Sequence, residues 1–204
     1  YDPYSSSKAC AELVVSAYRR SFFPIDNYNS HKKLIASARA GNVIGGGDWA
    51  KDRLIPDCMR ALYQNEPIVV RNPKSIRPWQ HVLDSLCGYL MLAEKLFEGS
   101  TEHGTAFNFS PHIDDAKPVE WIVKEICKKW GNNCQYVIDQ DKKQLHESSL
   151  LKLDNSRATK KLKWQSRWNL DKTFHETIKW YQQFSSDKAA QKITKDQILL
   201  FMGT

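Results

Sequence analysis

The sequence contains no apolar run long enough to cross a membrane and no recognisable cleavable signal. A membrane-spanning helix needs roughly 18 or more consecutive apolar residues, and no segment of this chain reaches that length. A secretory signal would combine a basic start, a short apolar core and a small-residue cleavage site. We therefore expect a cytoplasmic protein with no membrane partner.

Cysteine is scarce and scattered through the chain. The five cysteines stand singly, without a C-x-x-C pair, at Cys10, Cys58, Cys87, Cys127 and Cys134. An odd number of isolated cysteines argues against a disulfide framework and against a zinc site. We expect buried free thiols and no bound metal.

The chain also lacks a dinucleotide-binding glycine fingerprint, because neither G-x-G-x-x-G nor G-x-x-G-x-x-G occurs in it. In Rossmann folds this loop follows the first strand and lets a pyrophosphate approach the backbone. Whatever else the chain does, these residues do not supply that loop.

Basic residues outnumber acidic ones, with 30 Lys and Arg against 23 Asp and Glu and a net charge of +7. This balance suits nucleic acid, an acidic membrane surface or an anionic small molecule. The late lysines accompany tryptophans, but Trp121, Ile122, Ile126 and Trp130 recur at helical spacing. Such spacing favours burial in a core over stacking on bases. We expect a globular protein without a nucleic-acid partner.

A tyrosine and a lysine stand one helical turn apart in the run Y-S-S-S-K, which begins at Tyr4 and ends at Lys8. Residues at this spacing share a helix face. A nearby ammonium favours the phenolate, and unit charges about 4 Å apart at an effective dielectric near 20 interact by roughly 4 kcal/mol. Tyr4 could then accept a proton from a sugar hydroxyl. Alone, the pair is more typical of an exposed tyrosine beside a solvated lysine.

Two further segments carry chemistry. Residues 35–48 read I-A-S-A-R-A-G-N-V-I-G-G-G-D, which predicts a strand and then a glycine-rich turn where main-chain amides can approach a ligand. Residues 76–82 read I-R-P-W-Q-H-V, in which Pro78 restrains the backbone of Arg77. The planar guanidinium can bind a phosphate through paired hydrogen bonds, and a surface arginine in a loop is the alternative.

Apolar periodicity predicts alternating helices and strands. Helices are expected at 5–20, 55–63, 82–97, 119–130, 155–162, 171–184 and 194–201, and strands at 34–39, 68–71, 105–109, 135–138 and 150–153. This alternation is typical of an α/β fold with parallel strands.

In this order, the motifs Y-S-S-S-K, R-A-G-N-V-I-G-G-G-D-W, R-L-I-P-D, R-P-W-Q-H-V and A-F-N-F resemble the extended short-chain dehydrogenase/reductase family of nucleotide-sugar enzymes. The glycine-rich run, R-P-W-Q-H-V and the late His146-Glu147, Trp164 and Trp168 are most similar to its CDP-glucose 4,6-dehydratase branch. The resemblance covers essentially all 204 residues.

The resemblance implies the carboxyl-terminal part of a longer α/β enzyme, with something on the order of 100–200 residues in front. Residues 1–41 would complete a Rossmann-type parallel sheet that binds NAD. Residues 42–204 would mainly build a smaller, interleaved α/β domain for the nucleotide sugar, with about 82–109 packing back on the first domain. The resemblance also implies a homodimer or higher homo-oligomer, and an apolar face of the first helix left uncovered in this chain.

The implied reaction converts CDP-glucose to CDP-4-dehydro-6-deoxyglucose by oxidation at carbon 4, loss of water across carbons 5 and 6, and hydride return to carbon 6. Tyr4 would be the base of the first step and Lys8 would hold the nicotinamide ribose, with Val43 also at the cofactor. The substrate-binding residues carried over by the resemblance are Asn42, Arg53, Leu54, Pro67, Ile68, Val69, Arg77 for the diphosphate, Asn108 and His146.

Two alternatives stay open. The first is another nucleotide-sugar enzyme of the same superfamily, such as an epimerase or a dTDP- or GDP-sugar dehydratase. The second is a basic interaction module, which would need its Trp-Lys stretches exposed. In either enzyme reading, these 204 residues alone are expected to bind NAD poorly and to be inactive, because the phosphate-binding loop is absent.

Overall fold

The structure is a computed structural model that describes residues 2–131, 134–139 and 151–203. The chain divides into two units, and it passes between them several times. Unit 1 comprises Tyr1–Ala40, Leu86–Phe109 and Asp154–Gln165, and unit 2 comprises Gly41–Ser85, Ser110–Leu153 and Ser166–Thr204. Each unit is described by itself.

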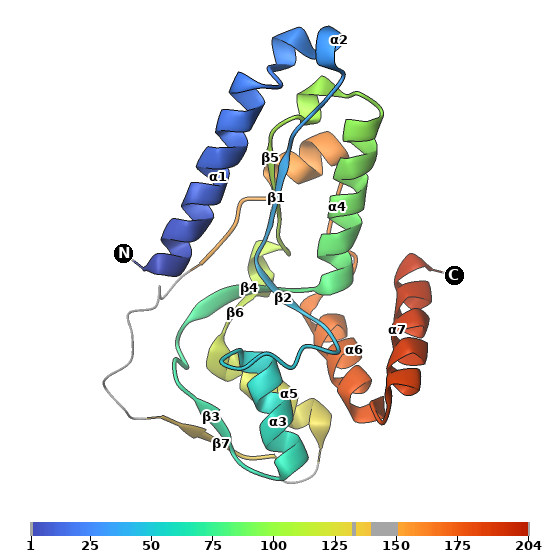
Figure 1. The fold of residues 1–204 in the computed structure, drawn as a ribbon. Helices are drawn as coiled ribbons and strands as arrows, with labels where there is room; N and C mark the ends of the chain where they lie inside the picture. The colour runs from blue at the N-terminus through green and yellow to red at the C-terminus, as the bar shows by residue number, and fades with distance from the viewer. Residues whose placement is uncertain (1, 132–133, 140–150, 204) are drawn as a thin grey trace. The chain divides into compact units, whose positions relative to one another are not determined.

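Unit 1 combines helices with a two-stranded parallel sheet (Figure 1). Its elements are α1 (Pro3–Ser21), η1 (Ile25–Asn27), α2 (Tyr28–His31), β1 (Ser37–Ala40), the later turns of α4 (Val82–Phe97), η2 (Thr101–His103), β5 (Ala106–Phe109) and the π-helical η4 (Ala158–Leu162). β1 and β5 pair with Ser37 opposite Ala106 and Ala40 opposite Phe109.

The core of unit 1 lies where α4 and η4 meet β5. Its buried members are Leu92, Phe107, Phe109, Ala158, Leu162 and Trp164. The helix approaches the strand closely at Gly88, since a Cβ there would lie 2.3 Å from a ring carbon of Phe109. Burial of Trp164 confirms that this tryptophan belongs to a core and is not free to stack on bases.

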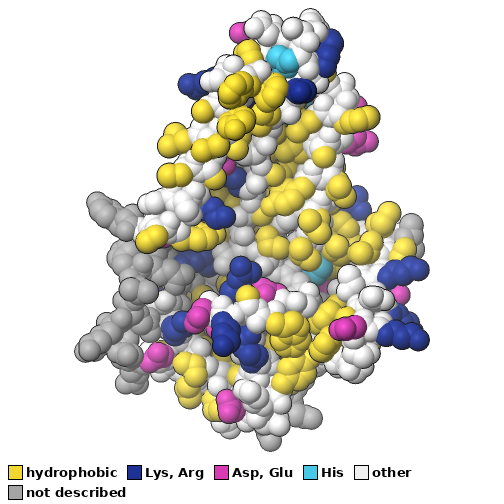
Figure 2. All heavy atoms as spheres, in the orientation of Figure 1, with side chains coloured by type: hydrophobic (Ala, Val, Ile, Leu, Met, Phe, Trp, Pro, Cys, Tyr) yellow, Lys and Arg dark blue, Asp and Glu magenta, His cyan; other side chains and the backbone are white. Residues whose placement is uncertain are grey.

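Helix α1 is well capped but poorly buried. The Asp2 carboxylate accepts a hydrogen bond from the Ser5 N–H at 2.8 Å, and Pro3 occupies the first turn, where no N–H partner is needed. None of the residues of α1 is buried. Its exposed apolar side chains include Leu13 and Tyr18, and hydrophobic atoms lie open along this part of the molecule (Figure 2). The predicted uncovered apolar face is confirmed.

Unit 2 contains the remaining elements. They are β2 (Asn42–Ile44), α3 (Leu54–Gln64), β3 (Ile68–Val70), β4 (Ile76–His81), the first turn of α4, η3 (Ile113–Asp115), β6 (Ala116–Pro118), α5 (Val119–Trp130), β7 (Tyr136–Ile138), α6 (Leu170–Gln183) and α7 (Asp187–Met202). One sheet has the order β2-β4-β6 and the other pairs β3 with β7.

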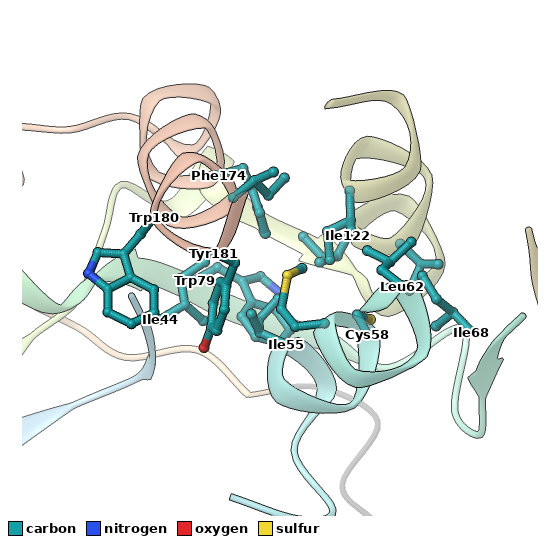
Figure 3. Close-up of a cluster of buried hydrophobic side chains, with 14 of the residues drawn as sticks. Ile44, Ile55, Cys58, Leu62, Ile68, Trp79, Ile122, Phe174, Trp180 and Tyr181 are labelled. Atoms are coloured by element: carbon teal, nitrogen blue, oxygen red, sulfur yellow. The ribbon is translucent and has the colours of Figure 1, made fainter. Parts of the chain in front are cut away.

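The core of unit 2 gathers side chains from α3, α5 and α6 over both sheets (Figure 3). Tyr181, Trp79, Trp180 and Ile44 are among its buried members. Burial raises the pKa of the Cys58 thiol to about 12, which fits a free thiol in an apolar site. Trp168 is also buried.

Most expected helices and strands are present, and the α/β class is confirmed. The helices predicted at 82–97 and 119–130 are α4 and α5 with those bounds. The strand expected at 150–153 is wrong for the described residues 151–153, which have no strand, although the Leu151 N–H donates to the Ile76 carbonyl at 3.2 Å. Pairing is not parallel throughout, because β4 and β6 run antiparallel.

The prediction for the cysteines is wrong at four of the five positions. Cys127 at the end of α5 and Cys134 before β7 form a disulfide, with their Cα atoms 5.0 Å apart. Cys10 is exposed and Cys87 is half-buried, so only Cys58 is a buried free thiol. The bridge was missed because the two cysteines are seven positions apart, and no local pattern indicates that they pair.

We expect the substitution Gly46→Ala to destabilise unit 2. An added Cβ would lie 2.0 Å from Cγ of Trp180, so the indole or the backbone must move, at a cost of about 1–3 kcal/mol or more. Urea unfolding followed by tryptophan fluorescence measures the loss. The exposed Lys51→Ala in the same loop is the control and should stay within about 0.5 kcal/mol of the unaltered chain. Equal stability of both variants would contradict the packing argument.

Candidate functional site

In unit 1, the tyrosine and lysine of the Y-S-S-S-K run lie in the first two turns of α1, on one face of the helix. The Lys8 ammonium nitrogen is 5.4 Å from the centre of the Tyr4 ring. Tyr4 is 71% exposed, and Lys8 is exposed as well. The proximity expected from the spacing is therefore present, with both polar ends open to a ligand.

Asn108 lies on β5 of the same unit and uses both ends of its amide within the protein. Its Oδ1 accepts a hydrogen bond from Arg39 Nη1 at 3.3 Å, and its Nδ2 donates to the Asp154 carbonyl at 2.9 Å. These contacts connect β5 with β1 and with the segment that leads into η4. The side chain therefore has a structural role in unit 1, whatever ligand it meets.

In unit 2, the register of the sheet brings Asn42 and Arg77 to one face. Asn42 on β2 pairs with Trp79 on β4, and directly paired residues share a face. Arg77 lies two residues before Trp79 on β4, so it points to that same side. Val43 follows Asn42 on β2, so it points to the other face of the sheet, and it is 37% exposed.

Arg77 lies on strand β4, so the alternative of a surface arginine in a loop is wrong. It is 6% exposed and pairs with Lys117 of β6. Its Nη1 donates a hydrogen bond to the carbonyl of the preceding residue, Ile76, at 2.9 Å. A guanidinium held in a buried strand has little conformational freedom left to lose when it binds an anion. This geometry suits recognition of a phosphate at a fixed position.

The glycines of this run pack closely against other side chains of unit 2, and the interpretation of the run as a ligand-binding turn stays a prediction. Residues 42–44 are strand β2, and the turn comes only at Gly46 and Gly47. A Cβ on Gly41 would lie 2.7 Å from Cγ of Pro78, and one on Gly46 would overlap the indole of Trp180. These glycines are required because other side chains of unit 2 occupy the space beside them.

The loop after this turn is held by aromatic and charged side chains. The hydroxyl of Tyr181 donates to the Asp48 carbonyl at 2.7 Å, and Trp49 packs edge-on against the Tyr181 ring. Arg60 donates from Nη1 to the Trp49 carbonyl at 2.8 Å. The loop is therefore fixed at several points before it reaches Arg53.

Arg53 and Leu54 stand at the start of α3. Arg53 is the N-cap residue, and its exposed guanidinium lies 3.3 Å from an oxygen of Asp48. Leu54 is half-buried against the core of unit 2. An exposed ion pair of this kind contributes little to stability, so Arg53 can exchange Asp48 for an anionic ligand at low cost.

The segment Pro67, Ile68 and Val69 does not present three side chains to a ligand. Ile68 is 1% exposed and packs in the core, while Val69 on the opposite face of β3 is 57% exposed. Pro67 precedes the strand and is exposed. Any nucleoside contact from Ile68 must therefore come from its backbone. His146 and Glu147 lie outside the described residues.

His81 ends β4 in a buried position. Its Nδ1 accepts a hydrogen bond from the Leu83 N–H at 3.2 Å, its ring lies 4.6 Å from that of Trp168, and its Nε2 has no hydrogen-bond partner among the described residues. Burial lowers the pKa of His81 to about 4, against a smaller opposing effect of Glu176. The neutral imidazole is the form that this core accepts.

In the part of the chain that the structure describes, no three His, Cys, Asp or Glu side chains gather as metal ligands would. Among the same residues, no helix combines the length and apolarity that a membrane crossing requires.

The architecture and sequence place the chain in a known class. Its fold is that of NAD-binding Rossmann-type dehydratases and epimerases. One such structure is dTDP-glucose 4,6-dehydratase from Bacillus anthracis in complex with NAD. The match covers 95% of this chain and 55% of that chain, with TM-score 0.70 and 19% identity. UDP-glucuronic acid 4-epimerase from Bacillus cereus matches 89% of this chain and 53% of its own with TM-score 0.73 and 15% identity.

The GDP-mannose 4,6-dehydratase family model matches residues 1–177, and the chain belongs to this family. It is 50% identical over 181 residues to CDP-glucose 4,6-dehydratase of Salmonella typhimurium, which covers 89% of this chain and 50% of the relative. A trifunctional UDP-glucose 4,6-dehydratase of Arabidopsis thaliana is 25% identical over 183 residues, 89% of this chain and 25% of the relative. The resemblance inferred from the motifs is confirmed, and the chain spans half or less of the length of these relatives.

Acidification should destabilise unit 2 through His81. Its folded pKa of about 4 lies below the ordinary value of 6.5, so the unfolded chain binds the proton first. The stability from neutral His81 is complete above about pH 6.5 and is lost as the pH falls through about 4, by up to about 3 kcal/mol. Urea unfolding at a series of pH values measures this slope.

The matched variant is His81→Asn, whose side-chain oxygen can still accept from the Leu83 N–H. It should show a shallower loss of stability over the same pH range. Parallel curves for the two proteins would mean that His81 titrates normally in the folded state.

Proposed function

We propose that this chain is the proton-transfer and sugar-nucleotide-binding part of a longer CDP-glucose 4,6-dehydratase. The observation that carries the proposal is the 50% identity over 181 residues to a CDP-glucose 4,6-dehydratase. The exposed Tyr4–Lys8 pair in unit 1 and the buried Arg77 in unit 2 support it, because both suit the chemistry of a nucleotide sugar.

In this proposal, Tyr4 takes the proton from the hydroxyl on carbon 4 of the glucose. The neighbouring Lys8 ammonium stabilises the phenolate that must form before the proton moves. Oxidation leaves a ketone at carbon 4, which acidifies carbon 5 so that a proton leaves there and water departs across carbons 5 and 6. The product is CDP-4-dehydro-6-deoxyglucose and one water.

The residues present fit part of an NAD site. A phenol and an ammonium on the open face of α1 can meet ribose hydroxyls, and the exposed Val43 offers an apolar contact in unit 2. The hydride chemistry at carbons 4 and 6 belongs to NAD when it is bound. No glycine fingerprint for its pyrophosphate occurs in these 204 residues, so that contact must come from elsewhere in the longer protein.

The substrate would be held chiefly by unit 2. Arg77 would bind the diphosphate and Asn42, on the same face of the sheet, the sugar. Arg53 and Leu54 would flank the nucleotide at the start of α3, with Pro67 to Val69 bordering the nucleoside. Asn108 and His146 complete the set that the resemblance suggests.

Several broader assignments belong to the same proposal. The exposed apolar side chains of α1 would meet a second subunit or another part of the longer protein. The product would enter deoxysugar synthesis, including that of lipopolysaccharide O-antigen, in the cytoplasm. The alternative of a basic interaction module is disfavoured, because Trp164 and Trp168 are buried.

In the full-length enzyme, Tyr4→Phe should lower kcat about 10²- to 10⁴-fold while affinity for CDP-glucose changes less than about twofold. The phenyl ring keeps the shape of the side chain but cannot accept the proton. Steady-state rates and equilibrium binding measure the two effects. Tyr18→Phe, at an exposed tyrosine of the same helix, is the control and should keep full activity. Unchanged kcat in Tyr4→Phe would reject this role for Tyr4.

Arg77→Ala should instead weaken binding of CDP-glucose. A charge-assisted hydrogen bond is worth about 1.5–3 kcal/mol, which corresponds to roughly 10- to 150-fold in affinity. Because Arg77 is buried, Arg77→Lys is made in parallel, and thermal unfolding shows whether each variant is folded. A folded variant with unchanged affinity would remove Arg77 from the site.

Nucleotide choice is tested by calorimetric titration of this 204-residue chain with CDP-glucose, UDP-glucose and dTDP-glucose. Selective binding of the CDP sugar is expected if the residues that recognise the base lie in unit 2. A preference for UDP- or dTDP-glucose would move the assignment to another nucleotide-sugar enzyme. If none binds, the same titration of the full-length protein decides the question.

A further inference from the structure

A third functional side chain lies on the face of α1 that carries Tyr4 and Lys8. Glu12 follows Lys8 by the same four-residue step that separates Lys8 from Tyr4. Residues at this spacing line up along one face of a helix. The rotation of α1 about its axis therefore sets the direction of all three side chains together.

The Glu12 carboxylate is bound to β1 through three hydrogen bonds. Arg39 donates from Nε to one oxygen and from Nη2 to the other, each at 2.7 Å, and the Ser37 hydroxyl donates to Glu12 at 3.0 Å. A paired contact between a guanidinium and a carboxylate fixes orientation as well as distance. The pKa of Glu12 is lowered, chiefly by its hydrogen bonds to Arg39, so the carboxylate stays ionised at neutral pH.

The opposite side of Arg39 is fixed as well. Its Nη1 donates to Asn108 on β5, and Asn108 in turn donates to the Asp154 carbonyl. Glu12 is thus connected through Arg39 to both strands of the sheet in unit 1. All three guanidinium nitrogens of Arg39 donate hydrogen bonds, so its side chain is held in one orientation and can in turn orient α1 through Glu12.

Apolar packing contributes little to the orientation of α1, because none of its residues is buried. Arg19, near the far end of α1, also contacts the rest of the unit, because its Nε donates to the Ile35 carbonyl at 3.0 Å. The Glu12–Arg39 pair is 37% and 43% exposed, and exposed ion pairs contribute little to stability. The Glu12–Arg39 pair therefore orients α1 more than it stabilises unit 1.

We propose that Glu12 and Arg39 are positioning residues that set the rotation of α1 and so aim Tyr4 and Lys8 at the substrate. The inference rests on the proposed function for its effect on catalysis. Its structural half, that the pair holds α1 against β1, stands independently of which reaction the protein carries out.

The test uses Glu12→Gln, Arg39→Gln and the double variant in the full-length enzyme. Each single variant should lower kcat roughly 10- to 100-fold, the scale expected when a reacting group is misplaced, with KM within about twofold. The double variant should be no worse than the poorer single one, because both remove the same contact. Arg39→Lys keeps the charge but not the paired geometry and should fall in between.

Glu102→Gln is the matched control, since Glu102 of η2 forms an exposed ion pair with Lys161 of η4 in the same unit, and neither residue belongs to α1 or β1. It should keep full activity. A readout independent of activity is backbone hydrogen exchange in residues 4–12, which should become faster in Glu12→Gln and Arg39→Gln and stay unchanged in Glu102→Gln.

The outcomes separate the two proposals. Full activity and unchanged exchange in Glu12→Gln overturn this inference while a loss of activity in Tyr4→Phe leaves the proposed function standing. Full activity in Tyr4→Phe overturns the role of Tyr4, and the exchange data then still decide whether the pair orients α1. Additive losses in the double variant would show that Glu12 and Arg39 act separately.

Discussion

The backbone of residues 41–47 lies so close to Pro78 and Trp180 that only glycine fits at the points of contact, and the arrangement of unit 2 depends on this approach. It allows β2 to pair with β4, which sets Asn42 and Arg77 on one face of the sheet. It also places the following residues, Asp48 and Trp49, in contact with Tyr181. A larger residue at Gly46 would disturb all of these features together, because they share one short segment.

The two units position their functional side chains by different physical means. In unit 2, Arg77 is fixed by a sheet that forms part of a dense apolar core, and interiors of this density resist small displacements. In unit 1, Tyr4 and Lys8 stand on a helix with no buried residue, and polar contacts from Glu12 and Arg19 hold it. Elements with few buried contacts open at the lowest free energies. The groups proposed for proton transfer, Tyr4 and Lys8, therefore lie on the less firmly held part of this chain.

Much of the fold could be predicted from the sequence, because long helices carry a strong periodic signal. α4 and α5 were located to the residue. Strand β4 was missed because Pro78 cannot donate to a ladder and argues against a strand interior. The structure accommodates it because β2 pairs with residues 79–81 and β6 with residues 76–78. Pro78 lies where the pairing of β4 changes from β6 to β2, and no local sequence pattern indicates this change.

The candidate site was predictable only where its residues are close in sequence. The Tyr4–Lys8 contact follows from helical spacing, and the same rule would have extended to Glu12 one turn later. Its partner Arg39 could not be found in this way, because the pairing depends on how α1 lies beside β1. Burial of Ile68 likewise depends on which face of β3 meets the core, and three residues are too few to set that pattern.

The role of the glycine-rich run changes where base selectivity should be sought. This run is among the motifs most similar to the CDP-glucose branch, yet its glycines contact Pro78 and Trp180 of the same unit. A motif used for packing can distinguish a branch of a family without touching the base. Two exposed side chains of the same unit, Arg53 at the start of α3 and Val69 on β3, are free to vary without disturbing the core. If these residues bind a nucleotide, selectivity for the base belongs to such positions, and the glycines provide the backbone path that leads to them.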